Sequence, residues 1–396
     1  MAYGIVLKDS LISLMKETTE GTYVAPTGAT SFSQPNTDKI SLVPSKEWHE
    51  SGRITGSLGQ AKPRGGIKKV AGKYGYELRG SGTVGIAPQW DILIQSLLGT
   101  APNIMAAAAV ITAGATTTVL PMSSGDVSKF AVGMPVMVQK ANNWFFTTVA
   151  SVQAGTSITV SPALPYSPVA TTPVAQAILY APANSGHPSF STTIYWANKI
   201  TQMASGQKVK SFQLSNFKAG QIPIMEFDAE GINYQTDVAG AAGYTPSYDQ
   251  ALSPVVLNAI IYQAGTAIVV DEFQIKVDNT LSPLPSTADP NGIVSQRVSK
   301  RIVSGAFAPY KDDTLVTNFT NFNTEAMFSV FITATNPDPA NTGQFLPGNN
   351  FCIYLPNVIT KTLEVKNLSG ILQDAIGFEA VGGVDGTIPE VYFGFV

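Results

Sequence analysis

The sequence predicts a mainly β fold made of two related units, each carrying one α-helix, together with a small all-β insertion. Three observations support this prediction. A strand pattern occurs twice in the chain, a short helical pattern occurs once in each half, and a Val/Thr-rich stretch interrupts the first half.

The repeated pattern consists of two strand-like runs that are separated by a turn glycine and end in Phe-acid-Ala. The first copy contains Gly220 and the sequence 227–229, and the second contains Gly370 and the sequence 378–380. Upstream strands match in the same order, residues 189–196 with 327–334 and, more faintly, residues 70–78 with 302–310. Conserved order over four elements indicates a duplicated unit, which favours quasi-symmetric assembly. Chance similarity between two β-rich segments is the alternative.

This pattern divides the chain into five segments. We expect an N-terminal extended arm (1–36), the first part of unit one (37–105), an inserted all-β domain (106–175), the second part of unit one (176–250) and unit two (251–396). The inserted segment is rich in Val, Thr and turn residues and nearly free of acids, and the second unit has no counterpart to it.

Each unit is expected to contain one packed helix. In the first unit the apolar residues follow helical spacing between Pro88 and Gly99, at Trp90, Leu93, Ile94, Leu97 and Leu98. In the second unit a weaker helix is predicted by Leu315, Phe319 and Phe322. Strict alternation in residues 271–278 predicts a strand with Phe273, Ile275 and Val277 on one face.

Composition indicates a protein whose surface is covered by neighbouring subunits. Hydrophobic residues make up 44% of the chain and charged residues 13%, about half the usual charged share, yet no apolar run is long enough to span a membrane. A polar Thr/Ser/Asn-rich β surface is the alternative. The net charge of −3 argues against global affinity for nucleic acid, and the single Cys352 excludes an internal disulfide. Residues 1–21 lack a signal-peptide pattern, so we expect folding in a cytoplasm.

No catalytic, metal or cofactor site is expected. The segment Gly80–Gly85 has the form Gly-x-Gly-x-x-Gly, but no acid lies between Asp91 and Asp126 to contact a ribose, which favours a simple turn. The two histidines, His49 and His187, have no neighbouring ligands. Cys352 lies in a strand-like run and is expected in the core. We therefore expect no enzyme activity.

One cluster of basic residues is distinctive because glycines are interspersed among its lysines and arginines. Its candidate residues are Arg53, Lys62, Arg64, Lys68, Lys69 and Lys73. A basic loop of this kind either binds nucleic acid through phosphates or docks against an acidic surface of another subunit. Because the rest of the chain is net acidic, we favour the contact between subunits or rings.

Taken together, these segments resemble the major tail tube proteins of long-tailed, non-contractile bacteriophages. The segments that carry the resemblance are residues 17–27, 45–56, 72–85, 97–99, 271–279, 301–313 and 353–358. The resemblance implies a β-sandwich or half-barrel with a flanking helix, and subunits that form stacked rings around a continuous inner barrel. It also implies a location in the virion tail and assembly in the host bacterial cytoplasm.

The resemblance further implies the partners of the chain. These are other copies of itself, the tail terminator, tape measure and distal tail proteins, and double-stranded DNA in transit, with no membrane insertion. Because the chain carries two units, a ring of three chains is preferred, and a ring of six is the alternative. A virion decoration protein or an adhesin-type β protein is the alternative function.

Acids on alternating strands are the candidates for the lumen lining, since DNA must pass without basic phosphate clamps. The candidates are Glu226, Asp228, Glu230 and Glu272. We expect their polar side to face the lumen, and we expect the inserted domain to decorate the exterior.

Overall fold

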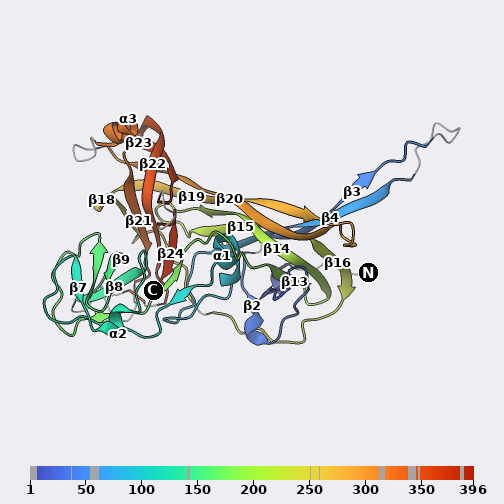
Figure 1. Ribbon diagram of the computed structural model, residues 1–396, viewed down its shortest axis with the longest axis horizontal. Helices are drawn as coiled ribbons and strands as arrows, with labels where there is room; N and C mark the ends of the chain where they lie inside the picture. The colour runs from blue at the N-terminus through green and yellow to red at the C-terminus, as the bar shows by residue number, and fades with distance from the viewer. Residues whose placement is uncertain are drawn as a thin grey trace.

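The structure is a computed structural model that describes residues 7–36, 38–53, 62–140, 143–249, 251–257, 259–311, 317–337, 345–346, 348–383 and 388–396. It is elongated, with a long β-hairpin projecting from one end and a second strand bundle rising at the other (Figure 1). The prediction of a mainly β fold is confirmed: one sheet contains 18 strands and a separate sheet contains 6.

The first half of the chain contributes ten strands to the large sheet. These are β1 (Leu11–Lys16), β2 (Phe32–Ser33), β3 (Ile40–His49), β4 (Arg64–Glu77), β5 (Asn103–Ile104), β12 (Ile178–Tyr180), β13 (Phe190–Trp196), β14 (Ile200–Ser215), β15 (Ile224–Gly231) and β16 (Asn233–Ala239).

The second half contributes the remaining eight. These are β17 (Ile260–Gln263), β18 (Thr266–Ile268), β19 (Val270–Pro285), β20 (Ile293–Pro309), β21 (Phe328–Ala334), β22 (Phe351–Leu368), β23 (Ile371–Ala380) and β24 (Tyr392–Phe395).

The repeat in the sequence is also a repeat in strand pairing. In the first half β1 pairs with β13, β13 with β14, β14 with β15, β15 with β4, and β4 with β3. In the second half β17 pairs with β21, β21 with β22, β22 with β23, β23 with β20, and β20 with β19. All ten pairings are antiparallel, so both halves have the same local topology.

One further pairing joins the two repeats into a continuous surface. Strand β14 pairs with β19 over the register Ser211↔Asp278 to Leu214↔Ile275. The result is a continuous eight-stranded surface in the order β3-β4-β15-β14-β19-β20-β23-β22, which we call the wall.

A single hydrophobic core underlies both repeats. Trp90, which is 1% exposed, packs its ring against Tyr76, Phe227 and Phe395 at centroid distances of 6.2, 6.4 and 5.6 Å. Because Phe395 comes from the last strand of the chain, this aromatic cluster ties the two halves together.

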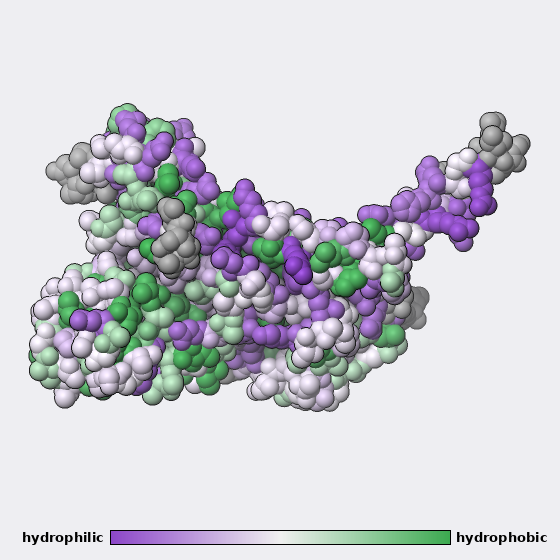
Figure 2. All heavy atoms as spheres, viewed as in Figure 1, coloured by the Kyte–Doolittle hydropathy of each residue, from purple (hydrophilic) through white to green (hydrophobic). Residues whose placement is uncertain are grey.

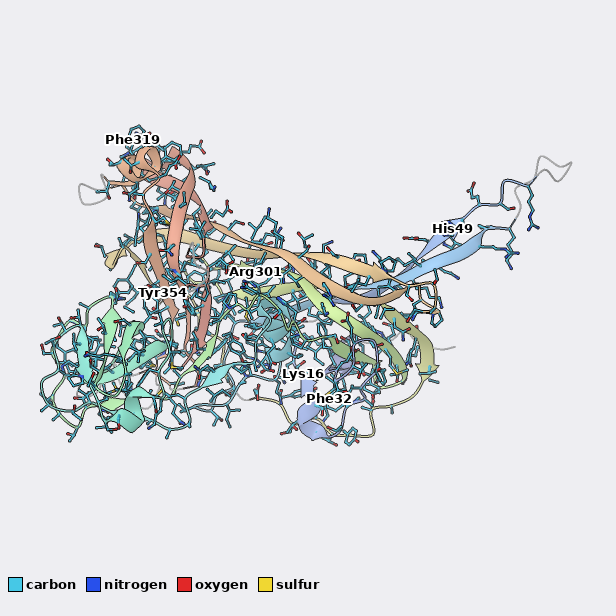
Figure 3. The ribbon with its side chains drawn as sticks, viewed as in Figure 1. Lys16, Phe32, His49, Arg301, Phe319 and Tyr354 are labelled. Atoms are coloured by element: carbon cyan, nitrogen blue, oxygen red, sulfur yellow. The ribbon has the colours of Figure 1, made fainter. Side chains whose placement is uncertain are left out.

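The two predicted helices form, but only the first is packed. Helix α1 (Asp91–Leu98) buries seven of its eight residues and ends at Gly99, whose φ of 90° suits glycine. Helix α3 (Thr317–Thr324) buries only Asn318. Phe319 is 64% exposed and lies at the top of the second strand bundle (Figure 3), so the expectation of a packed second helix is wrong. Leu315 lies outside the described residues.

The inserted segment forms the separate six-stranded sheet. Its strands are β6 (Ala109–Val110), β7 (Val119–Pro121), β8 (Pro135–Lys140), β9 (Asn143–Gln153), β10 (Ser157–Ser161) and β11 (Pro173–Val174), with a short helix α2 (Ser124–Val127). Its core includes Tyr392 and Val396 from the end of the chain. Gly133 lies on the Tyr392 ring so closely that a Cβ there would be 2.6 Å from ring atoms, so this segment is docked on the second repeat.

The N-terminal segment is part of the sheet rather than a free arm. Turn η1 (Leu7–Asp9) precedes β1, and turn η2 (Ala29–Ser31) precedes β2. The carboxylate of Glu17 is buried and accepts hydrogen bonds from Gly21 N, Ser189 Oγ, Ser191 Oγ and Gly206 N at 2.7–2.9 Å. This satisfied carboxylate fixes the segment to β13 and β14, which is why it does not extend away.

Candidate functional site

The wall has one apolar face and one polar face, because side chains alternate along each strand. On β15 the residues Met225, Phe227 and Ala229 are buried in the core. Glu226, Asp228 and Glu230 alternate with them and therefore share the opposite face. Three of the four candidate lumen acids thus lie in a row on one strand.

The fourth candidate acid lies on the same polar face in the second repeat. Glu272 precedes the buried Phe273 on β19 and accepts a hydrogen bond from Gln274. Both polar residues line an open hollow of about 440 Å³ that extends to Glu364 and Lys366 on β22. The four acids predicted from the sequence are therefore distributed over the polar face of both repeats.

The structure also places lysines on this face, directly beside the acids. Lys69 Nζ lies 3.1 Å from Glu230, and Lys39 Nζ lies 3.5 Å from Glu226. Lys73 is the cross-strand partner of Asp228, a position that brings their Cβ atoms to about 5 Å. Two residues of the predicted basic cluster, Lys69 and Lys73, are thus neighbours of two predicted lumen acids, Glu230 and Asp228.

Glycine in β4 makes one of these ion pairs possible. Gly75 lies opposite Glu226, and a Cβ at Gly75 would be 2.3 Å from Cβ of Lys39. The Lys39 side chain therefore crosses the strand through the space that a larger residue would fill. This close approach explains a glycine within a strand.

The second repeat carries the same kind of pairs with different residues. Lys276 lies 2.9 Å from Asp278. Lys361 lies 3.2 Å from Glu379, and Lys366 lies 3.6 Å from Glu364. The Lys361–Glu379 pair joins two strands, so it depends on a pairing register that is not visible in the sequence. The other two pairs join residues two positions apart on one strand, so strand alternation alone could have indicated them.

The basic cluster is mostly a strand and not a loop. Arg64, Lys68, Lys69 and Lys73 belong to β4, so the prediction of a flexible loop is wrong for them. Arg53 and Lys62 lie beyond the paired strands β3 and β4, at the limits of the described residues, and both are exposed.

This hairpin projects beyond the body of the molecule, and we call its described residues 44–53 and 62–68 the arm. Figure 3 places His49 far out on it, and Figure 2 shows that its surface is almost wholly hydrophilic. Trp48 is an exception: it is 62% exposed, and Lys46 Nζ lies 5.0 Å from its ring centre. An exposed Trp beside cations is typical of a protein contact surface.

The wall ends in two strand edges. Among the described residues, β3 pairs only with β4, and β22 from Ile359 onwards pairs only with β23. Strand β14 is the equivalent of β22 in the first repeat. Its residues Ser211–Leu214, which follow the part paired with β13, pair with β19. Unpaired edges are sites for pairing with another chain.

The segments that resembled enzyme motifs are structural. The Gly80–Gly85 segment is a packed turn, since a Cβ on Gly80 would be 2.1 Å from the carbonyl oxygen of Gly348. The ring of His187 contacts the carbonyl oxygen of Ser96, and burial lowers its pKa. Burial raises the pKa of the Cys352 thiol, which lies in the core.

The described part of the chain brings no three metal-ligating side chains together. Within the same residues, no helix combines the length and apolar composition that crossing a membrane requires.

Two comparisons with known proteins bear on the family to which the chain belongs. A search of curated proteins found no match. A family model described as phage tail tube protein matches residues 8–373, which is nearly the whole chain. The chain therefore belongs to the phage tail tube protein family, whose members are structural proteins of the virion tail.

Proposed function

We propose that this chain polymerises as stacked rings into a tail tube, and that the lumen of the tube conducts double-stranded DNA during ejection. The observation that supports this most strongly is the junction between the two repeats. Strand β14 of the first repeat joins β19 of the second, while β22 and β3 leave the equivalent edges open. A second copy of the chain supplies the missing partner for each edge.

The internal junction supplies a register for the junction between chains. Gln213 lies opposite Lys276 across β14 and β19. Gln213 pairs with Glu226, the residue before the first Phe-acid-Ala motif. Thr362 pairs with Gly377, the residue before the second motif, so Thr362 is the equivalent of Gln213 in the second repeat. In the same way Ser41 is the equivalent of Lys276. We therefore expect Ser41 of one chain opposite Thr362 of the next.

Each chain contributes two repeats, so three chains supply six repeats to a ring. We prefer this ring of three, because the β14–β19 junction already makes one of every two contacts within the chain. A ring of six chains is the alternative.

The polar face of the wall is proposed to line the lumen. The opposite face is covered by α1, β13 and the hydrophobic core and has no room for a channel. Glu226, Asp228, Glu230 and Glu272 would then face the passing DNA. The inserted sheet packs away from the wall, against the end of the chain, and would decorate the exterior.

The arm is proposed to contact a neighbouring chain within the ring or in the next ring. The β19–β20 hairpin gives a precedent inside the chain, because its outer part lies on the first repeat. Asn279 Nδ2 donates to the carbonyl of Leu97 at 2.8 Å, and Gln296 N donates to Glu20 at 2.7 Å. The arm occupies the same place in the first repeat. Its inner end contacts the tip of the β19–β20 hairpin, because Lys68 N donates to the carbonyl of Asn291 at 3.2 Å, whereas the rest of its described length projects away from the body (Figure 1).

If the chain forms the tail tube, its other expected partners are the proteins at the ends and inside of the tube. They are the tail terminator, tape measure and distal tail proteins, with assembly in the host cytoplasm.

Negative-stain electron microscopy of the purified protein tests this proposal. Hollow tubes built of stacked rings are expected. A variant in which residues 49–64 are replaced by a short turn keeps the strand residues that pair with β15, so it should fold but no longer form tubes. A monodisperse monomer at all salt and protein concentrations would contradict the proposal and favour a decoration or adhesin protein.

A further inference from the structure

Many of the lysines on the polar face of the wall form ion pairs. Six of its lysines lie within 4.0 Å of a carboxylate: Lys39, Lys69, Lys210, Lys276, Lys361 and Lys366. Glu230 serves two of them, at 3.1 Å from Lys69 and 4.0 Å from Lys210. Ion pairs occur in both repeats although the residues differ.

We infer that the acids of this face act mainly by masking neighbouring lysines from DNA phosphates, and not by repelling DNA through a negative field. The inference rests on the proposed function, in which this face lines the lumen. It concerns the electrostatic interaction between the polar face of the wall and the phosphates of a passing duplex.

The physical reason is the short range of a charge pair. Two opposite charges at 3–4 Å form a dipole, and its potential falls faster with distance than that of a lone charge. At physiological ionic strength the remainder is screened within about 8 Å. A phosphate that passes outside this range meets neither an attractive lysine nor a repulsive carboxylate.

In the first repeat, neighbouring residues help to hold the pairs across strands. Lys39 reaches Glu226 over Gly75, as described above. Ser211 Oγ donates to Asp228 at 3.0 Å and Ser215 Oγ donates to Glu226 at 3.0 Å, so neighbouring hydroxyl groups orient two of the acids. Hydrogen bonds of this kind hold a carboxylate beside its lysine at no cost in net charge.

Masking and repulsion predict different effects for the same substitutions. If the acids mask lysines, removing the acids turns the lysines into phosphate clamps, and removing the lysines changes little. If the acids instead repel DNA through their negative field, removing the acids raises DNA binding even in tubes that lack the lysines. Three variants of assembled tubes separate these cases: an acid-free variant (E226Q, D228N, E230Q), a lysine-free variant (K39Q, K69Q, K73Q, K210Q) that includes the cross-strand neighbour of Asp228, and the combination of both.

The measurement is the binding of a short fluorescent DNA duplex to sedimented tubes at several salt concentrations. A duplex blocked by streptavidin at both ends cannot enter a lumen and reports binding to the exterior. The substitution D126N is a matched control, because Asp126 forms a 2.6 Å ion pair with Lys129 in the inserted sheet. It removes the same charge from a pair that lies away from the wall.

We expect the acid-free tubes to bind the open duplex and not the blocked one. Four lysines that each contact a phosphate would make the binding constant fall roughly 150-fold from about 50 to about 200 mM salt. The wild type, the lysine-free variant, the combined variant and D126N are expected to bind no more than background.

The inference is overturned if acid-free tubes bind no more DNA than the wild type, or if the combined variant binds more DNA than the lysine-free variant, because removing the acids would then matter where no lysine remains to be masked. If the acid-free chain does not form tubes, the single variant E230Q, which frees both Lys69 and Lys210, gives the same comparison. Absence of tubes from the wild-type chain would instead refute the proposed function, so the two failures are distinguishable.

Discussion

A disulfide bond across the proposed junction between chains tests its register. In the double variant S41C/T362C, each thiol of one chain should lie opposite the partner thiol of the next chain. Directly opposed residues of an antiparallel pair have Cβ atoms about 4.5–5.5 Å apart, within small backbone adjustments of the roughly 3.5–4.5 Å that a disulfide requires. A residue two positions away lies at about 7–8 Å, which is too far.

The assay is non-reducing gel electrophoresis of oxidised tubes. We expect a ladder of covalent species that ends at three chains. The endogenous Cys352 should not interfere, since it is 1% exposed and burial raises its pKa. The shifted variant S41C/E364C and each single variant should stay monomeric on the gel.

The internal junction provides a positive control with the same geometry. The variant Q213C/K276C should form a disulfide within one chain, because these residues are paired in the structure. If this control is oxidised while S41C/T362C is not, the proposed register is refuted. A ladder that ends at six chains would refute the ring of three and retain the junction.

Three further predictions concern stability, and thermal unfolding of the monomer measures each of them. The substitution E17A leaves two buried hydroxyl groups and two backbone N–H groups without an acceptor, so it should cost about 2–4 kcal/mol, and an unchanged melting temperature would contradict the role given to Glu17. G80A should destabilise the turn because its Cβ would lie 2.1 Å from the oxygen of Gly348, whereas G125A, with nothing within 4 Å, should be neutral; equal effects would refute the steric argument. Burial lowers the pKa of His187 in the folded chain, so the unfolded chain binds a proton at higher pH, and the free energy of unfolding should fall as the pH drops below about 6.5. The variant H187N should lose less stability over this pH range. An identical loss in H187N and the wild type would show that His187 is not responsible.

The duplication could be predicted from the sequence because it depends on residue types at a turn and in a short motif. Gly220 and Gly370 have φ values of 76° and 93°, which few other residues tolerate. The Phe-acid-Ala motifs that follow place one aromatic side chain in the core and one acid on the polar face. These requirements are local, so they remain visible in both copies.

Helix packing could be predicted only for α1. The apolar spacing in both helices shows which residues share a face, but it does not show what covers that face. In α1 that face is covered by the core of the same chain. In α3 Phe319 and Phe322 remain 64% and 37% exposed.

The basic cluster was misassigned because glycine was read as a loop signal. In β4 the glycines instead make room for neighbouring side chains, as Gly75 does for Lys39 and Gly72 for Tyr74 and Gln207. Strand register then brings Lys69 and Lys73 beside the acids of β15. Pairing partners come from tertiary structure, so the ion pairs that join two strands, such as Lys69–Glu230, could not be predicted from the sequence.

The most direct test of the account is a cryo-electron microscopy reconstruction of the assembled tube. The account predicts three chains in each ring, β3 of one chain paired with β22 of the next, and the polar face of the wall toward the lumen. A tube in which these edges remain unpaired, or in which Glu226, Asp228 and Glu230 face the exterior, would contradict it.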